Sequence, residues 1–410
     1  MTSRERVRKA LNHQEPDRVP IGFCGNIFTG IHIDEYIKLT KYLGMDTETP
    51  RVYDQFQMLA RIDDTFRKRI HTDMIELENP SMTWGFRNNR WKEWVTGKGN
   101  TVLMPTDFNP TRDEKGYIYI NDVKGNPIAF MPSDGLYFER TCPTGMSDKL
   151  EKMDPEDWKE LLPVYTDEEL RELEKNASEI YNNTQYSVCG AFNRGQLSTY
   201  GIYAGHTITD WMIILMTDEA YAYSLLRAHV ENAVKNLEVY LQAVGKYLDT
   251  IVISGFDFGI QDRELFNPEI FKDLYLPNYK LINDYVHNNC NAKTVYHSCG
   301  SNWNLIEYFI EAGWDVLNPV QTTAANMDPV KLKEKFGSRI TFLGGGIDTQ
   351  TVLPFGTPDK VVEQVKERIK IFSPGGGFIF SQIHNTQYGV PPENYIAMVD
   401  AAYEFGIYPV

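Results

Sequence analysis

The sequence predicts a (β/α)8 TIM barrel. Strand-like and helix-like segments alternate along most of the 410 residues, and the strand-like segments number eight. Eight βα units with crossovers of helical length favour a closed barrel over an open sheet. Polar residues also stand where the later strand-like segments end, as expected if those ends surround one active-site mouth.

The eight predicted strands are short apolar runs that are rich in β-branched and aromatic residues. Turn residues or helical patterns separate them from one another. We expect these strands at residues 18–24, 73–77, 186–192, 250–257, 293–297, 314–320, 339–344 and 377–383.

The predicted helices carry recognisable start signals. Thr2 followed by Glu5 resembles a capping box, which opens an amphipathic helix that runs to about Asn12. Pro268 and Pro358 stand at the first positions of two later helices, where the missing N–H of proline is tolerated. Between the strands we expect helices at 218–248, 267–288, 303–312 and 357–372.

Residues 84–140 interrupt this alternation. The segment is rich in Trp, Tyr, Gly, Pro and Asn, with period-two alternation at 117–120 and turn signals at 115–116 and 124–126. We predict β-hairpins inserted after the second strand of a single domain that spans residues 1–410. Insertions in barrels usually occupy loops at the mouth, so this one is expected to form a lid or substrate wall, or else a structural element that could support a homodimer.

Composition narrows the class of protein. A formal net charge of −15 argues against a nucleic acid or an anionic membrane as the main partner. No apolar run approaches the ~18 residues of a membrane span, and the charged N-terminal segment does not resemble a signal peptide. The five cysteines are scattered along the chain, and no two of them form a CxxC motif. We therefore expect a cytoplasmic protein that acts on a small molecule.

The most informative segment is the strand at 293–297 and the residues that follow it. It delivers His297 and Cys299 two positions apart, and in an extended chain such residues point to the same side. Imidazole and thiolate are good ligands for a borderline-soft ion such as Zn²⁺. Two ligands do not make a site, and both side chains could simply be packed or hydrogen-bonded there.

Other strand ends supply more polar groups to the same mouth. Asp257 follows the fourth strand, and His384 follows the eighth. His384 is the predicted third metal ligand, and Asp257 is predicted either to orient the site or to be a further ligand. The residues expected to bind substrate are Asn318, Gln321, Asp348 and Asn385.

Several motifs together resemble the uroporphyrinogen decarboxylase superfamily over essentially the whole chain. That resemblance implies a (β/α)8 barrel with the active site in its mouth. The motifs are RERV at 4–7, PDRVP at 16–20, FDFGIQ at 256–261, YHSCG at 296–300, LNPVQ at 317–321, GIDTQ at 346–350 and VPPEN at 390–394.

Within this superfamily the chain departs from true uroporphyrinogen decarboxylases. Those enzymes carry an Arg-rich loop after the first strand, whereas residues 25–31 here contain no basic residue, so a substrate with many carboxylates is disfavoured. The His-x-Cys pattern instead resembles the zinc-dependent methyltransferases that work with corrinoid proteins. In many of these the third ligand is a Cys in a Ser-Pro-Gly-Cys-Gly stretch. Residues 373–377 here read SPGGG, so His384 is expected in its place.

The resemblance implies a methyltransferase that uses zinc and a methylcobalamin carried by a partner corrinoid protein. The substrate would be a small methylated compound, of the methoxyaromatic or methylthiol type, with O-demethylation the expected reaction. Asp257, His297 and Cys299 would be the catalytic residues. The alternative is a metal-free enzyme of the same superfamily, in which His297 and Cys299 only line the pocket.

Overall fold

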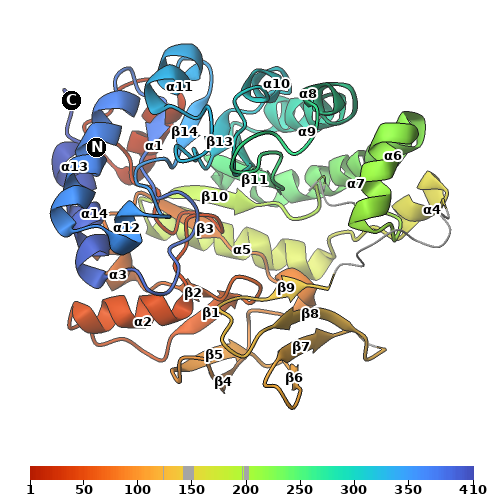
Figure 1. Cartoon of the computed structure of the whole chain (residues 1–410), viewed down its shortest axis with the longest axis horizontal. Helices are drawn as coiled ribbons and strands as arrows, with labels where there is room; N and C mark the ends of the chain where they lie inside the picture. The colour runs from red at the N-terminus through yellow and green to blue at the C-terminus, as the bar shows by residue number, and fades with distance from the viewer. Residues whose placement is uncertain (123, 142–151, 196, 198–202) are drawn as a thin grey trace.

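The computed structural model describes residues 1–122, 124–141, 152–195, 197 and 203–410. Its centre is a curled parallel sheet of seven strands, in the order β15-β14-β13-β12-β11-β10-β3 (Figure 1). The strands are β3 (Met74–Leu77), β10 (Ser187–Ala191), β11 (Thr250–Gly255), β12 (Lys293–His297), β13 (Val316–Asn318), β14 (Thr341–Leu343) and β15 (Phe378–Ile379).

The segment at 20–22 lies between the two edges of this sheet. The N–H of Gly22 donates to the carbonyl of Phe380 at 2.8 Å, and the N–H of Asp73 donates to the carbonyl of Ile21 at 2.7 Å. The predicted first strand thus occupies its expected position, but it forms isolated bridges rather than a ladder. The barrel predicted from the sequence is confirmed.

Helices surround the sheet, and the predicted ones agree with the structure to within a few residues. One difference is that the helix expected at 267–288 is divided by a π-helical turn, η3 (Phe271–Tyr275). No helix in the described ranges is long and apolar enough to cross a membrane. The α-helices are α1 (Ser3–Leu11), α2 (Ile33–Tyr42), α3 (Asp64–Arg69), α4 (Pro155–Glu160), α5 (Asp167–Asn183), α6 (Ile208–Thr217), α7 (Glu219–Val244), α8 (Pro268–Ile270), α9 (Leu276–Asn289), α10 (Ile306–Glu311), α11 (Pro329–Phe336), α12 (Val352–Phe355), α13 (Pro358–Phe372) and α14 (Pro392–Phe405).

The barrel interior is a packed apolar layer, to which each of the seven strands contributes one buried side chain. Helix α1, whose predicted capping box is present, adds Val7, Ala10 and Leu11 to this layer from the N-terminal end of the strands. Because the interior is filled, chemistry is confined to the opposite end, the mouth. The strand residues of the layer are Met74, Cys189, Val252, Val295, Val316, Leu343 and Ile379.

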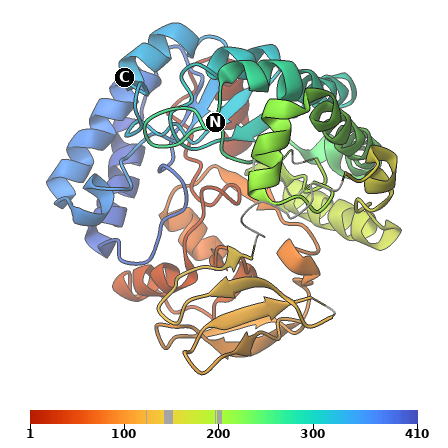
Figure 2. The same ribbon diagram turned by 45° about the vertical axis from the view of Figure 1, so that its right-hand side comes forward.

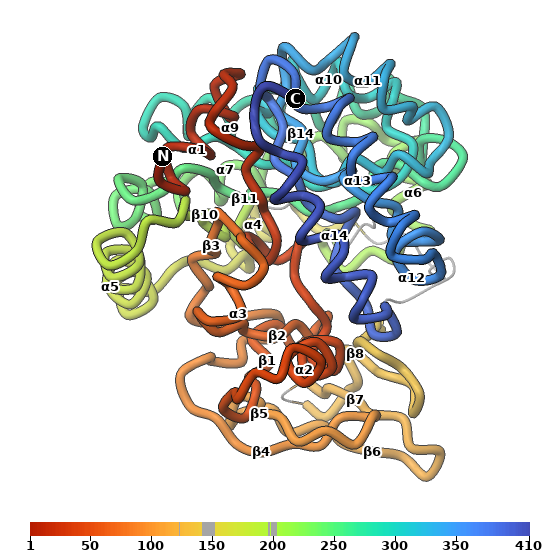
Figure 3. Tube along the Cα trace, turned by 90° about the vertical axis from the view of Figure 1, so that its left-hand side faces the viewer, coloured from red at the N-terminus to blue at the C-terminus, as the bar shows by residue number. Residues whose placement is uncertain are grey.

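A buried ion-pair network ties the closed end of the barrel together. The carboxylate of Asp73, which is fully buried, accepts from Arg6 at 2.7 Å and from Arg18 at 2.8 Å. It also accepts the N–H of Ile21 at 2.8 Å. This network joins α1, the segment at 20–22 and the start of β3. It lies on the side of the molecule where both chain ends lie (Figure 3).

The predicted insertion forms most of two small β-sheets, one mixed and one antiparallel, that lie well away from α1 (Figures 1 and 2). The first sheet has the order β2-β1-β5-β4 and the second β6-β7-β8-β9. Strands β1 and β2 come from before the second barrel strand, and the sequence analysis did not anticipate them. Strand β1 joins through a single parallel pairing of Arg51 with Leu103, which no local pattern announces. The strands are β1 (Arg51–Asp54), β2 (Leu59–Arg61), β4 (Trp91–Val95), β5 (Thr101–Pro105), β6 (Thr111–Arg112), β7 (Ile118–Asn121), β8 (Pro127–Met131) and β9 (Glu139–Arg140).

Candidate metal centre

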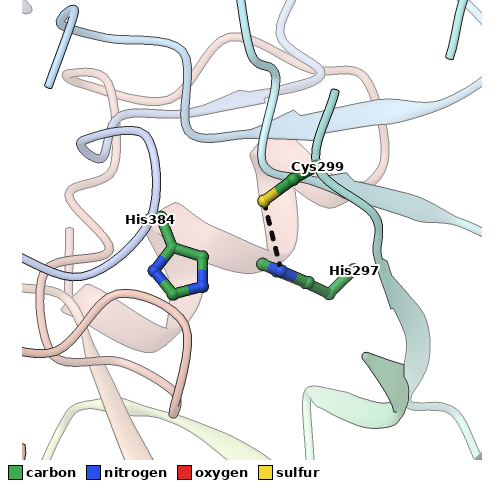
Figure 4. Close-up of side chains that lie close together, drawn as sticks. All are labelled: His297, Cys299 and His384. Atoms are coloured by element: carbon green, nitrogen blue, oxygen red, sulfur yellow. Dashed lines mark hydrogen bonds between the residues drawn. The ribbon is translucent and has the colours of Figure 1, made fainter. Parts of the chain in front are cut away.

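His297 and Cys299 face a common point at the barrel mouth. His297 is the last residue of β12 and is buried, and the chain turns away at Gly300, whose φ is 84°. The Sγ atom of Cys299 lies 3.6 Å from Nε2 of His297 (Figure 4). Nitrogen and sulfur ligands of a tetrahedral zinc ion are separated by about 3.5 Å, given bond lengths of about 2.0 and 2.3 Å. The observed separation therefore suits a shared ion.

His384 completes a group of three potential ligands. One ligand atom from each of His297, Cys299 and His384 lies within 4.8 Å of the other two, and Figure 4 shows the His384 ring facing the other two side chains. The two imidazole rings are 5.2 Å apart between centroids. His384 reaches this position from the loop after β15, with a φ of 62°.

Asn318, at the end of β13, determines which nitrogen of His297 can bind an ion. Its Nδ2 donates to the carbonyl of Leu343 at 2.9 Å. Its Oδ1 is therefore left to accept from Nδ1 of His297, at 2.7 Å. With the ring proton held on Nδ1, the lone pair of Nε2 faces Cys299.

The electrostatics of the group suit a cation. Burial lowers the pKa of His297 to about 4 and that of His384 to about 3, so both imidazoles are neutral near pH 7 and free to bind. Burial, followed by the charge of Asp257, raises the pKa of the Cys299 thiol well above its usual range. The thiol would give up its proton when a divalent ion binds, as metal-ligating cysteines do.

Asp257 lies beside the group rather than within it. Its Oδ1 accepts the backbone N–H of Cys299 at 2.7 Å and stands 3.8 Å from Nε2 of His297. Burial raises the pKa of this carboxyl, yet its side chain is 34% exposed. Asp257 thus holds the backbone of Cys299 in place, while part of its carboxyl group remains exposed at the mouth.

The other residues predicted to bind substrate also lie at the mouth, but their polar atoms hold loops in place. Gln321 accepts the N–H of Gly300 at 2.8 Å. Asp348 accepts backbone N–H groups of its own loop. Asn385 accepts the N–H of Gly30 at 2.6 Å. A direct role in substrate binding for these residues and for Asn318 stays a prediction.

Phe28 is a residue of this site that the sequence analysis did not identify. Its ring stacks on His297 with centroids 3.8 Å apart and an interplanar angle of 20°. Gly255 makes room for it, because a Cβ at that position would stand 2.3 Å from the Phe28 ring. The sequence signal available was the glycine at the end of a strand, which often marks a close approach.

Comparisons with known proteins agree with this architecture. Residues 204–405 match the uroporphyrinogen decarboxylase family, and the chain contains a domain of that family. A uroporphyrinogen decarboxylase from Psychromonas ingrahamii is 27% identical over 114 residues, which is 28% of this chain and only 30% of the relative. A methyltransferase from Methanosarcina mazei has a similar fold, with a TM-score of 0.56, 16% identity and 99% of both chains covered.

Proposed function

We propose that this chain is a zinc-dependent methyltransferase that moves a methyl group between a small methylated compound and a corrinoid protein. The observation that carries the proposal is the convergence of His297, Cys299 and His384 at the barrel mouth, with ligand atoms within 4.8 Å of one another. Two imidazoles and a thiol form a donor set suited to zinc, and three protein ligands leave the fourth position for substrate.

Zinc held by these residues would supply Lewis acidity to a substrate heteroatom, which makes that atom a better leaving group or nucleophile. The chain's own groups prepare the site. Asn318 keeps the ring proton of His297 on Nδ1, and Phe28 covers one face of that ring. Asp257 anchors the backbone of Cys299 and presents a carboxyl edge to the mouth.

In the demethylation direction the bond between the methyl carbon and the heteroatom breaks, and its electron pair stays on the substrate, which later takes a proton. A reduced corrinoid on a partner protein would accept the methyl group and would supply the electron pair for the new bond to the methyl carbon. The likeness in fold to the Methanosarcina mazei methyltransferase and the superfamily motifs support methyl transfer. The corrinoid partner follows from the resemblance alone.

A second candidate is a metal-free enzyme of the same superfamily. It is favoured by the contact between Cys299 and His297, because 3.6 Å from sulfur to nitrogen also fits a thiol–imidazole hydrogen bond. In that case the Cys299 thiol, which burial keeps protonated, would stay protonated, and the site would hold no ion.

Elemental analysis separates the two candidates. We expect about one zinc per chain in protein purified without chelator, and its loss in Cys299→Ala and in His384→Ala. Cys290→Ala is the matched control, since this half-buried cysteine contacts the carbonyl of Gly245 and should retain zinc. The absence of any bound metal would overturn the zinc mechanism and favour the metal-free enzyme.

Methyl transfer is tested directly with a purified corrinoid protein in its reduced state. Formation of methylcobalamin from a panel of methoxyaromatic and methylthio compounds would be followed by absorbance. Activity that requires zinc and is lost in Cys299→Ala would support the proposal. If the zinc-loaded protein transferred no methyl group to a corrinoid and none from it, the proposal would be refuted.

A further inference from the structure

A cavity of about 470 Å³ opens at the mouth between the barrel and the insertion. Its walls come from β3, β10 and β11, and from the beginning and end of the inserted segment. Its volume lies in the range of small-molecule sites. Residues that line it include Glu76, Asn79, Trp84, Arg140, Phe192 and Arg194.

This cavity adjoins the metal centre through one short loop. Ile27 lines the cavity, and the next residue, Phe28, stacks on His297. The carbonyl of Ile27 accepts from Asn385 at 3.0 Å, and Asn385 follows His384 in the chain. The loop at residues 27–28 therefore contacts both the cavity and the group of potential metal ligands.

Polar atoms without partners gather at this cavity. Oε1 of Glu76, Oδ1 of Asn79 and Nε of Arg194 are buried and have no hydrogen-bond partner among the residues that the structure describes. Glu76 is only 8% exposed and Asn79 only 5%. Buried polar groups are nearly always hydrogen-bonded in native proteins, so these three atoms mark polar walls of the cavity that the described residues leave unpaired.

The charge of the cavity favours an anion, in a chain of formal net charge −15. Its charged lining residues are Glu76, Arg140 and Arg194. Burial raises the pKa of Glu76 to about 8, so this carboxyl is neutral near pH 7, and its Oε2 accepts from Tyr53. Two guanidinium groups then face the cavity without a full countercharge.

The guanidinium of Arg194 is held ready for a ligand. It donates to Oδ1 of Asn193 at 2.7 Å, lies 3.6 Å from the carboxylate of Glu169 and stacks over the ring of Tyr165. Arg140 is exposed and makes no ion pair with any described residue. The Arg140 guanidinium lies over the ring of Phe56, 5.7 Å from its centroid. One guanidinium held in place and a second one without an ion pair together suit a carboxylate.

We propose that this cavity binds the methyl donor and that the donor is a small aromatic carboxylate. Its ring would lie against Trp84 and Phe192, and its carboxylate would meet Arg140 and Arg194. This inference rests on the proposed function for the identity of the ligand as a methyl donor, but the cavity itself can be tested without methyl transfer.

The test is isothermal titration calorimetry of the full chain, as purified, with 4-methoxybenzoate. We expect binding that is at least ten times tighter than that of the uncharged 4-methoxybenzamide. Arg194→Met and Arg140→Met should each weaken binding of the benzoate by about 10- to 100-fold, as expected for the loss of a charge-assisted hydrogen bond. Arg112→Met, on an exposed strand of the insertion, should leave it unchanged.

Arg140 is exposed, so its substitution keeps the test valid if Arg194→Met does not fold. Equal affinity for the benzoate and the benzamide, no binding of either, or unchanged binding by Arg140→Met would overturn this inference. Zinc-dependent methyl transfer from another donor, with no benzoate binding, would leave the proposed function standing. Benzoate binding without any methyl transfer would support the cavity and reject the proposed function.

Discussion

Replacing Asn318 with leucine tests how the protein prepares His297 for a metal ion. Leucine has a similar shape but can neither accept from Nδ1 of His297 nor donate to the carbonyl of Leu343. In the present structure these contacts measure 2.7 and 2.9 Å and are fully buried. The variant should therefore release the ring proton of His297 to either nitrogen, and the ring should lose its fixed orientation.

The expected effect follows from the loss of one buried hydrogen bond to a metal-ligating imidazole. Removing such a partner typically weakens metal affinity by about 10- to 100-fold, or about 1.4 to 2.7 kcal/mol. The free energy of unfolding should also fall by about 1–3 kcal/mol, because the N–H of the ring and the carbonyl of Leu343 are left unpaired in the core.

Zinc affinity would be measured by competition with a chromophoric chelator, and stability by urea unfolding of the metal-free protein. Asn283→Leu is the matched control. Asn283 is equally buried, and its amide donates to the carbonyl of Ala312 at 2.7 Å. This control should lose stability and keep the zinc Kd of the wild type.

Two results would refute the reasoning about His297. One is a zinc Kd for Asn318→Leu within twofold of the wild-type value. The other is an equal loss of affinity in Asn283→Leu, which would mean that general destabilisation, rather than the orientation of His297, weakens zinc binding.

Three further predictions concern stability and packing. Asp73→Asn should lower the free energy of unfolding by about 3–5 kcal/mol in urea titrations, because two arginines lose their buried countercharge. The pKa of Glu76 is raised from 4.5 in the unfolded chain to about 8 in the fold, so the unfolded state releases the proton first. Wild-type stability should therefore fall as the pH rises from about 5 to 8, and Glu76→Gln should remove this part of the decline. Gly255→Ala should lower the thermal midpoint and displace Phe28 from His297, since the new Cβ would stand 2.3 Å from the Phe28 ring.

Each of these has an outcome that contradicts it. A loss below 1 kcal/mol for Asp73→Asn would show that solvent or another group replaces the carboxylate. Parallel pH profiles for the wild type and Glu76→Gln would mean that this carboxyl ionises normally in the fold. An unchanged melting temperature for Gly255→Ala would show that the loop carrying Phe28 yields without strain.

The barrel could be predicted because its strands are buried on both faces and so appear as short apolar runs between helical patterns. The prediction was least accurate where pairing is non-local. The segment around Ile21 closes the ring through single bridges to Phe380, so it has no ladder to mark its ends. Strands β1 and β2 joined the insertion through contacts between remote segments, which no local pattern encodes.

By itself the sequence determined the order of the βα units, the place of the insertion and the spacing that aims His297 and Cys299 at one point. These features depend on local periodicity, which neighbouring residues encode directly. Only the tertiary structure decided that His384 meets them, because two strands separate β15 from β12 in the sheet. It also decided which nitrogen of His297 is free, how Phe28 covers the ring, and that Glu76 is buried at a cavity with two arginines. Such contacts depend on the closure of the whole barrel, which brings together residues that are tens to hundreds of positions apart.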